Sequence, residues 1–265
     1  MTFAANFAAG GQNVWGYHLV NLLLHLLNGL LIYFLALRIW AISRFSGGGP
    51  LARSPIPEQA TTFALLAALF FIIHPVQTES VTYVSSRSEL LSTLFYIVAV
   101  LLFIRKAPEK IGFSFCLLTA AILVLALGAK ETTISLPAAL LLYDFIFLSN
   151  GDIRKVVRRW PFHTPFLAGG LAAAFYLAWF GNLRGSVGTG ASGISPYSYF
   201  LTELRVIVRY VQITLIPSGL NLAYDFPLSN SFWEPRVILS SYHLSAVLSV
   251  SPGNTEAQAL WQQLR

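Results

Sequence analysis

Residues 17–37 read YHLVNLLLHLLNGLLIYFLAL, an uninterrupted run without Asp, Glu, Lys or Arg. A helix of about 20 mainly apolar residues is long enough to cross the hydrocarbon core of a bilayer. The run therefore predicts a membrane-spanning helix, and Arg38 marks its end.

Charge-poor intervals of similar length follow along the chain and predict five further strong spans. They lie between Glu58 and Glu79 and at about residues 89–105, 111–129, 132–148 and 160–180. A weaker helical segment, at about residues 199–216, carries Glu203, Arg205 and Arg209. It could span the membrane, re-enter it or lie at its interface. The pattern predicts an all-α, polytopic integral membrane bundle of about six to seven spans.

The composition supports a lipid environment. Of the 265 residues, 55% are hydrophobic and 11% are charged, against about 25% charged residues in an ordinary soluble domain. This excludes a soluble globular enzyme, and 20 Phe, 11 Tyr and 6 Trp exclude a disordered chain. The net charge of +6 predicts no nucleic-acid partner, because the basic residues are scattered between apolar runs. The single Cys116 lies inside such a run and is interpreted as packing.

The loops alternate in Lys and Arg content. Residues 38–53, 105–110 and 154–159 are basic, whereas residues 74–89, 130–131 and 181–198 are poor in Lys and Arg. Cytoplasmic loops carry the excess of basic residues, so the first set is predicted to be cytoplasmic and the second periplasmic or lumenal. This puts residues 1–16 outside without a signal to translocate them, and we expect a missing first helix, with Met1 an internal start or a fragment boundary.

A polar stripe runs along the first span. His18, Asn21, His25 and Asn28 are spaced three, four and three, which places them on one helix face. Such a stripe either bonds the bundle together or lines a functional cavity. Packing is the favoured role for the last three, and His18, nearest the outer surface, is the cavity candidate.

The densest polar segment is residues 74–89, HPVQTESVTYVSSRSE, on the predicted outer side. As one helix it would put Glu79 and Glu89 on a common face, with Arg87 on an adjoining strip and His74 at its start. Ionisable groups so close to lipid favour a functional site. The alternative is a solvated connection with weak surface ion pairs.

Two smaller groups add candidates. Lys130 and Glu131 lie between the fourth and fifth spans, where a simple turn is the alternative because adjacent helical residues do not face each other. Arg205, Arg209 and Gln212 recur at four and three, and arginine's planar fork suits phosphate. Arginines that reach lipid headgroups from an interfacial helix are the alternative there.

No metal or cofactor is expected. The chain's histidines do not form a ligand cluster with diagnostic spacing; they are His18, His25, His74, His163 and His243. An outer cavity lined by carboxylates, His and Arg would suit transfer of a group from a lipid-linked phosphate donor, with Arg neutralising phosphate and a carboxylate taking the acceptor's proton. A transporter uses similar polar stripes, but the chain has no internal repeat of the kind many transporters carry.

Four segments, in this order, resemble the bacterial relatives of the transmembrane and tetratricopeptide-repeat O-mannosyltransferases. They are Asn13 to His25; His74 to Glu89; Lys130-Glu131 with Leu136-Pro137 and Tyr143-Asp144; and Tyr224-Asp225-Phe226-Pro227. The resemblance covers roughly residues 2–239. That family belongs to the GT-C class of membrane glycosyltransferases, which take sugar from a polyprenyl- or dolichyl-phosphate carrier on the outer or lumenal side.

The resemblance implies a lipid-linked sugar donor, mannose among the candidates, and a protein or glycan acceptor. The substrate-binding residues it implies are His18, His74, Glu79, Arg87, Glu89, Lys130, Glu131 and Asp225, with Arg205 and Arg209 at the carrier phosphate. It also implies the bacterial inner membrane, or the endoplasmic reticulum membrane in a eukaryote.

The chain departs from the family at both ends. GT-C enzymes carry their catalytic acid in the first outer loop, and this chain has no Asp or Glu before Glu58, so we expect that acid upstream of Met1 and leave the catalytic residue unassigned. Residues 251–257, SPGNTEA, resemble a turn between tetratricopeptide repeats. We therefore expect a partial GT-C-like domain at 1–239 and a repeat remnant at 240–265. A non-catalytic membrane scaffold, a degenerate remnant or, less favoured, a transporter are the alternatives.

Overall fold

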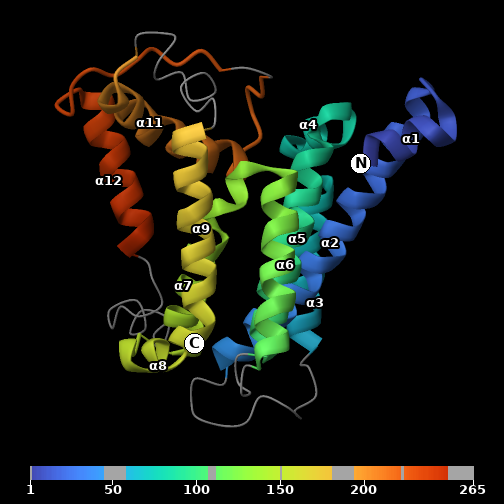
Figure 1. Cartoon of the computed structure of the whole chain (residues 1–265). Helices are drawn as coiled ribbons and strands as arrows, with labels where there is room; N and C mark the ends of the chain where they lie inside the picture. Colours follow the sequence, from blue (N-terminus) through green and yellow to red (C-terminus); the bar gives the residue numbers. More distant parts are fainter. Residues whose placement is uncertain are drawn as a thin grey trace. The chain divides into compact units, whose positions relative to one another are not determined.

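The structure is a computed structural model that describes residues 2–44, 58–106, 112–149, 151–180, 194–221 and 224–249. These residues form helices joined by turns and extended connections, and none of them is in a strand (Figure 1). The predicted all-α fold is therefore confirmed. The chain divides into two compact units, residues 1–172 and 173–265, which are described separately below.

The first unit contains most of the helices. They are α1 (Thr2–Gly10), α2 (Val14–Arg44), α3 (Glu58–Ile73), α4 (Thr78–Thr82), α5 (Arg87–Lys106), α6 (Phe113–Ala129), α7 (Leu136–Tyr143), α8 (Ile153–Arg158) and the first part of α9 (Trp160–Phe180). Short 3-10 turns lie at η1 (Pro75–Gln77), η2 (Val84–Ser86) and η3 (Glu131–Ser135), and α7 continues into a π-helix, η4 (Asp144–Leu148).

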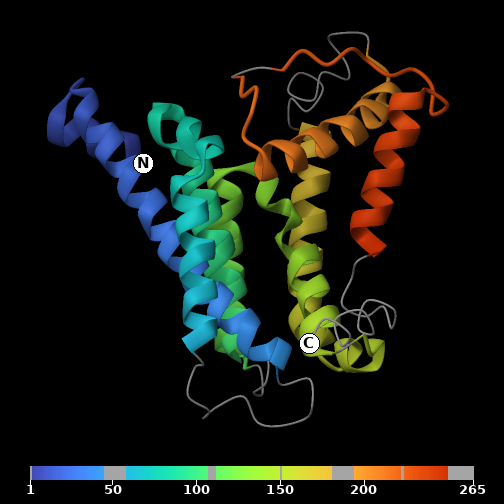
Figure 2. The same cartoon turned by 180° about the vertical axis from the view of Figure 1, so that it is seen from behind.

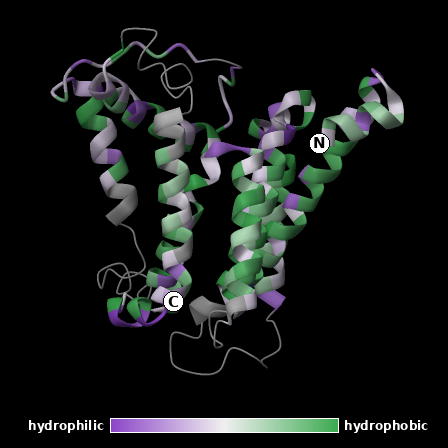
Figure 3. Ribbon diagram, in the orientation of Figure 1, coloured by the Kyte–Doolittle hydropathy of each residue, from purple (hydrophilic) through white to green (hydrophobic). Residues whose placement is uncertain are grey.

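Several of these helices have the length and apolar surface of membrane spans. Val14–Trp40, Val84–Arg105 and Glu131–Leu148 qualify singly, and Glu58–Ile73 with Pro75–Thr82 would add a fourth span bent by 48°. Most of the ribbon of α2, α5 and α6 has the colour of hydrophobic residues in Figure 3. The chain is thus a helical membrane protein, while the count of six to seven spans and the GT-C-like arrangement stay predictions.

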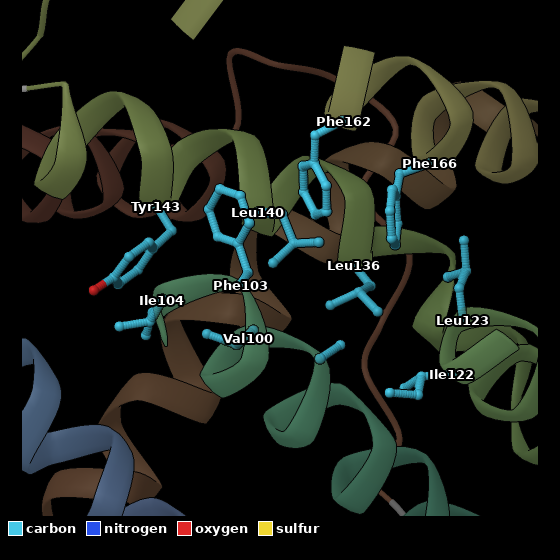
Figure 4. Packing of buried hydrophobic residues seen from close by; sticks show 11 residues of the cluster. Val100, Phe103, Ile104, Ile122, Leu123, Leu136, Leu140, Tyr143, Phe162 and Phe166 are labelled. Atoms are coloured by element: carbon cyan, nitrogen blue, oxygen red, sulfur yellow. The ribbon is translucent and has the colours of Figure 1, made fainter. Parts of the chain in front are cut away.

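Aromatic side chains form the centre of the first unit's core, between α5, α6, α7 and α9 (Figure 4). The rings of Phe103 and Phe162 stack with centroids 4.7 Å apart, and the ring centroids of Phe166 and Phe162 are 4.8 Å apart. All three are almost fully buried, as are Leu136 and Leu140. Each buried side chain of this size contributes about 1.5–3 kcal/mol in water; within lipid the close packing itself is the larger effect.

The break after α3 follows from Pro75. Proline has no N–H, and the residue before it is disfavoured in the helical region; His74 accordingly has φ −65° and ψ 128°. Its Nδ1 accepts a hydrogen bond of 3.2 Å from the Val76 N–H. The chain then turns through η1 into α4.

The connections within the first unit gather at two opposite ends (Figures 1 and 2). The C-terminal ends of α2 and α5, the start of α6 and all of α8 lie at one end, which carries Arg38, Arg105 and the basic residues of α8. We call it the basic end. The opposite end, called the upper end, carries α1, α4 and η3. This grouping agrees with the predicted alternation of loops; residues 45–57, 107–111 and 181–193 lie outside the described residues.

The second unit contains α11 (Pro196–Leu215) and α12 (Pro235–Ser249). The Ser195 side chain caps α11 by accepting a hydrogen bond of 3.0 Å from the Ser198 N–H. α11 has a strongly polar face opposite an apolar one, and it is not among the described helices that are apolar enough to span a membrane. The predicted domain boundary after residue 239 falls inside α12, and residues 250–265 lie outside the described part of the chain.

Candidate functional site

Two cavities meet at His18, at the upper end of the first unit. One of about 490 Å³ is lined by Phe3, His18, Thr82, Tyr83, Val84 and Ser85. The other, of about 480 Å³, is lined by Trp15, His18, Leu19, Leu22, Val81 and Thr82. We call this pair of cavities the His18 hollow. The prediction that His18 faces a cavity is confirmed, whereas its role in binding a substrate stays a prediction.

The rest of the polar stripe on α2 is used in packing, as predicted. Asn21, His25 and Asn28 are buried and reach backbone carbonyl groups of neighbouring segments. The acceptors are the oxygens of Tyr83 at 3.3 Å, Ile72 at 3.1 Å and Leu90 at 3.0 Å, respectively. Ile72 lies in the last turn of α3, where the carbonyl groups of a helix need partners from elsewhere.

Arg87 is fully buried and contacts no described carboxylate. Its Nε donates to Asn21 Oδ1 at 3.0 Å, and its Nη2 donates to the Tyr17 carbonyl at 3.1 Å. Its Nη1 donates to the Thr2 carbonyl at 3.2 Å and to Asn6 Oδ1 at 2.5 Å. Four of its five N–H groups are therefore used inside the fold, and Arg87 is not among the residues that line the His18 hollow.

Glu89 and Lys130 form an ion pair at the same end. Lys130 Nζ lies 2.5 Å from Glu89 Oε1, with 29% of the lysine side chain and 49% of the glutamate side chain exposed. Lys130 has an extended backbone between α6 and η3, so the two adjacent residues do not lie on one helix, and their part in substrate binding stays a prediction. Glu131 begins η3 and is exposed.

Residues 74–89 do not form one helix, which was the condition for the common face of Glu79 and Glu89. Pro75 starts η1, and the extended backbone of Tyr83, with φ −88° and ψ 115°, ends α4 before η2 begins. Glu79 lies exposed on α4 and Glu89 lies on α5, so the two carboxylates do not share a helical face. His74 is buried, where it caps η1.

The two arginines of α11 hold the loop that follows it. Arg205 Nη1 donates to the Pro227 carbonyl at 2.8 Å and to Ser229 Oγ at 2.9 Å. Arg209 Nη2 donates to the carbonyl groups of Ser218 at 3.0 Å and Gly219 at 3.3 Å. Gly219 has φ +63°, a conformation that favours glycine. Asp225 is exposed on the same loop. These residues belong to the second unit, and their part in carrier binding stays a prediction.

A carboxylate fixes the other end of that loop. Glu234 Oε1 accepts hydrogen bonds from the N–H groups of Asn230 at 2.8 Å and Ser231 at 3.2 Å. The Asn230 bond is the main reason that the pKa of Glu234 lies below its usual range, with smaller contributions from Ser229 and Arg205. The loop between α11 and α12 is thus secured by charged side chains on both sides.

The sequence reasoning missed a buried cluster at the basic end. Asp144 Oδ1 accepts hydrogen bonds from Ser149 Oγ at 2.8 Å and Arg159 Nη1 at 2.5 Å, and its Oδ2 lies 2.8 Å from His163 Nε2. Asp144 is fully buried, and its partner His163 is buried as well. An acidic residue inside the apolar run 132–148 was the available signal, because such a residue needs a partner at membrane depth.

A metal site has no counterpart in the described part of the chain, where no group of three or more His, Cys, Asp or Glu side chains could hold an ion. The groups that the structure shows at the upper end are a partly exposed ammonium group, carboxylates, an imidazole and hydroxyl groups beside an apolar surface.

Comparison with known proteins supports the family likeness over part of the chain. Protein O-mannosyl-transferase Tmtc3 of Drosophila melanogaster is 38% identical over 113 residues, which cover 42% of this chain and 12% of the relative. Human protein O-mannosyl-transferase TMTC1 is 28% identical over 159 residues, or 57% of this chain and 16% of the relative. Human protein O-mannosyl-transferase TMTC4 is 28% identical over 167 residues, which cover 60% of this chain and 22% of the relative.

No family model matches the chain, and no solved structure does. The matched segments span less than a quarter of the length of these relatives. The relatives are named as transferases of mannose to protein, so the distant homology supports a glycosyltransferase function for this chain.

Proposed function

We propose that this chain is part of a membrane glycosyltransferase. It would transfer a sugar, with mannose the first candidate, from a polyprenyl- or dolichyl-phosphate carrier to a hydroxyl group of a protein or glycan on the outer or lumenal side. The bacterial inner membrane and the endoplasmic reticulum membrane are the candidate locations. The observation that carries the proposal is that the Glu89–Lys130 pair and the His18 hollow lie at the same end of the first unit, in a chain that is similar over part of its length to O-mannosyl-transferases.

The His18 hollow has the divided character that a lipid-linked sugar requires. Trp15, Leu19 and Leu22 line its apolar part, on a helix long and apolar enough to span the membrane. His18 and Thr82 line both cavities, and Ser85 lines the other one; the side chains of Thr82 and Ser85 bear hydroxyl groups. A prenyl chain fits the first environment and a sugar hydroxyl the second.

Lys130 is the group proposed to meet the carrier phosphate. An ammonium group has three donors, and Glu89 accepts from Lys130 at one position. The others can donate to phosphate oxygens as negative charge develops on the leaving group. In the transfer, the acceptor oxygen bonds to the anomeric carbon, the carrier phosphate leaves with the bonding electrons, and a carboxylate takes the acceptor's proton. We assign that carboxylate to none of the described residues.

A transfer assay tests the proposal. The full chain in lipid nanodiscs is incubated with radiolabelled mannosyl-phosphoryl-polyprenol and a Ser/Thr-containing peptide, and label in the peptide is counted. Lys130→Met is expected to lower kcat/KM by about 100-fold, the effect of removing one charge-stabilising donor. Lys155→Met is the matched control, because Lys155 is exposed on α8 at the basic end. Equal transfer by both variants would contradict the role of Lys130.

A non-catalytic scaffold is the second candidate. The side-chain N–H groups of Asn21, Asn28 and Arg87 donate hydrogen bonds to acceptors within the fold. Such contacts are expected of a helix bundle whose polar stripes serve packing. The scaffold predicts that nanodiscs of the unaltered chain transfer no label above those of Lys130→Met. Activity of the unaltered chain that depends on Lys130 would exclude it.

A further inference from the structure

We infer that Arg87 is a positioning residue that docks helix α1 against the His18 hollow, and that it does not itself bind the ligand. The inference rests on the proposed function for the identity of that ligand, but the docking of α1 stands on contacts alone. α1 carries no buried residue. Apolar burial therefore contributes less to holding this helix in place than it does elsewhere in the first unit.

Arg87 supplies the main contacts that α1 makes. Its Nη1 donates to the Thr2 carbonyl and to Asn6 Oδ1, and its guanidinium lies 4.5 Å from the centre of the Phe3 ring. A cation over an aromatic face is worth about 0.5–2 kcal/mol, depending on its exposure. The other polar contacts of α1 are the bond from Asn6 Nδ2 to the Gly16 carbonyl and the bond from the Tyr17 hydroxyl to the Gly11 carbonyl, which joins α2 to the turn after α1.

The same guanidinium is anchored on the side away from α1. Asn21 and the Tyr17 carbonyl accept from its Nε and Nη2, and both acceptors belong to α2. Arg87 itself opens α5. One buried cation therefore links α1, α2 and α5. A buried charge without a carboxylate partner is costly unless its donors are satisfied, so the fold gains by keeping α1 in place over it.

The docked helix forms part of the hollow. Phe3 of α1 forms part of the wall of the cavity that His18 and residues 82–85 also line. The Phe3 ring also stacks on Tyr17, with centroids 6.3 Å apart. Undocking of α1 would remove this wall and leave Lys130 and Glu89 unchanged. Loss of Arg87 is therefore expected to weaken ligand binding more than it slows the chemical step.

Docking can be measured without any enzyme assay. Nitroxide labels on Phe7→Cys and Thr78→Cys, in a Cys116→Ser background, report the distance between α1 and α4 by pulsed electron spin resonance; both positions are exposed. A narrow distribution is expected for the otherwise unaltered chain in nanodiscs, and a broad one for Arg87→Gln. Arg154→Gln is the matched control, because Arg154 is exposed on α8, and its distance distribution should stay narrow. A narrow distribution in Arg87→Gln would overturn the inference.

A second variant covers the case in which Arg87→Gln does not fold. Asn6→Ala leaves the buried cation intact and removes one of its acceptors on α1. We expect a broader distance distribution with an unchanged midpoint of thermal unfolding, because α1 buries no side chain. If Asn6→Ala and Arg87→Lys both kept the narrow distribution, Arg87 would not be what holds α1.

The transfer assay then separates positioning from direct binding. Arg87→Lys is expected to raise KM for the labelled carrier about tenfold while kcat changes by less than about twofold. A short thiol-reactive crosslinker between Asn6→Cys and Gly16→Cys, in a Cys116→Ser background, should restore KM, since a Cβ at Gly16 would lie 3.4 Å from Asn6 Nδ2. Failure of this rescue would assign Arg87 to the ligand. If the unaltered chain transferred no label, the proposed function would be contradicted. The inference that Arg87 docks α1 would stand, because the spin-label distances test it separately.

Discussion

Gly29 shows how one small residue permits close packing of two membrane helices. A Cβ built at Gly29 of α2 would overlap Cγ1 and Cδ1 of Ile72 on α3. α3 itself buries Ala60, Ala64 and Ala68, one residue per turn. Small residues allow helix backbones to approach within lipid, where close packing replaces the hydrophobic effect as the main source of helix association. A glycine inside a long helix is explained by this contact.

The variant Gly29→Ala should therefore destabilise the protein. Overpacking of a tight contact costs about 1–3 kcal/mol, to be measured as the free energy of unfolding in mixed micelles. Gly128→Ala in α6 is the control, because a Cβ there meets nothing within 4 Å, and it should gain up to about 1 kcal/mol of helix stability. A stabilising Gly29→Ala would show that α2 and α3 are not packed as described.

Residue roles were predictable from the sequence only where the cause is local. The spacing of His18, Asn21, His25 and Asn28 on one helix follows from helical geometry, and it identified both the packing residues and the cavity residue. The partners of Arg87 lie 66 to 85 residues away in the chain. No local pattern encodes such contacts, so the link that Arg87 makes between helices could not be predicted from the sequence, and its predicted part in substrate binding is not tested by these contacts.

At the scale of elements, the buried Asp144 joins three segments at the basic end. Its own π-helix η4, the residue that ends α8 and the first turn of α9 meet at one carboxylate, through Arg159 and His163. Neither basic partner is more than a quarter exposed. Removal of one member of a buried charged group leaves the others without compensation.

Asp144→Ala should accordingly cost about 3–5 kcal/mol of unfolding free energy. The matched control is Asp152→Ala, which removes only the N-cap of α8, where Asp152 Oδ1 accepts from the Arg154 N–H at 2.9 Å; a lost cap costs about 1 kcal/mol. Both variants would be compared by denaturant titration in the same micelles. If the two costs were equal, the Asp144 cluster would not be a structural centre.

The loop before α12 should be sensitive to acid through Glu234. Hydrogen bonds from Asn230 and Ser231 keep the native pKa of this carboxylate below the ordinary value of 4.5. Its stabilising effect is therefore complete above the ordinary pKa and is lost as the pH falls through the lowered native pKa. We expect amide hydrogen-exchange protection at residues 230–231 to fall as the pH drops below the ordinary pKa of 4.5 and through the lowered native pKa.

The variant Glu234→Gln is the control for that experiment. A neutral amide oxygen still accepts hydrogen bonds but does not titrate, so protection at residues 230–231 should be weaker than in the unaltered chain and independent of pH. Equal pH dependence in the two proteins would assign the effect to another group. Protection factors, which correct for the intrinsic effect of pH on exchange, are the quantity to compare.

Elements were predicted well where hydropathy alone determines them. α2, α5, α6 and α9 occupy the expected apolar intervals, because a long apolar run in lipid has few alternatives to a helix. The segment 74–89 was predicted less well. Pro75 explains its first break, but the second, at Tyr83, has no proline or glycine. There Asn21 binds the Tyr83 carbonyl from another helix, so tertiary structure ends α4.

At the scale of the whole molecule, the clearest regularity is the separation of charge between the two ends of the first unit. The basic end carries Arg38, Arg105 and the basic residues of α8, while the upper end carries the His18 hollow and the Glu89–Lys130 pair. Retention of Lys and Arg on the cytoplasmic side of membranes makes this a prediction of orientation. The proposed function requires that orientation, since lipid-linked sugars would then meet the upper end outside.

Cysteine labelling tests the orientation directly. In a Cys116→Ser background, Thr78→Cys on α4 and Ile153→Cys on α8 place single exposed thiols at the upper end and the basic end. A membrane-impermeant maleimide added to intact cells should label Thr78→Cys at once and Ile153→Cys only after the membrane is permeabilised. Both thiols should react in detergent, which controls for accessibility. The reverse pattern in intact cells would place the His18 hollow in the cytoplasm, where transfer from an outward-facing carrier could not occur.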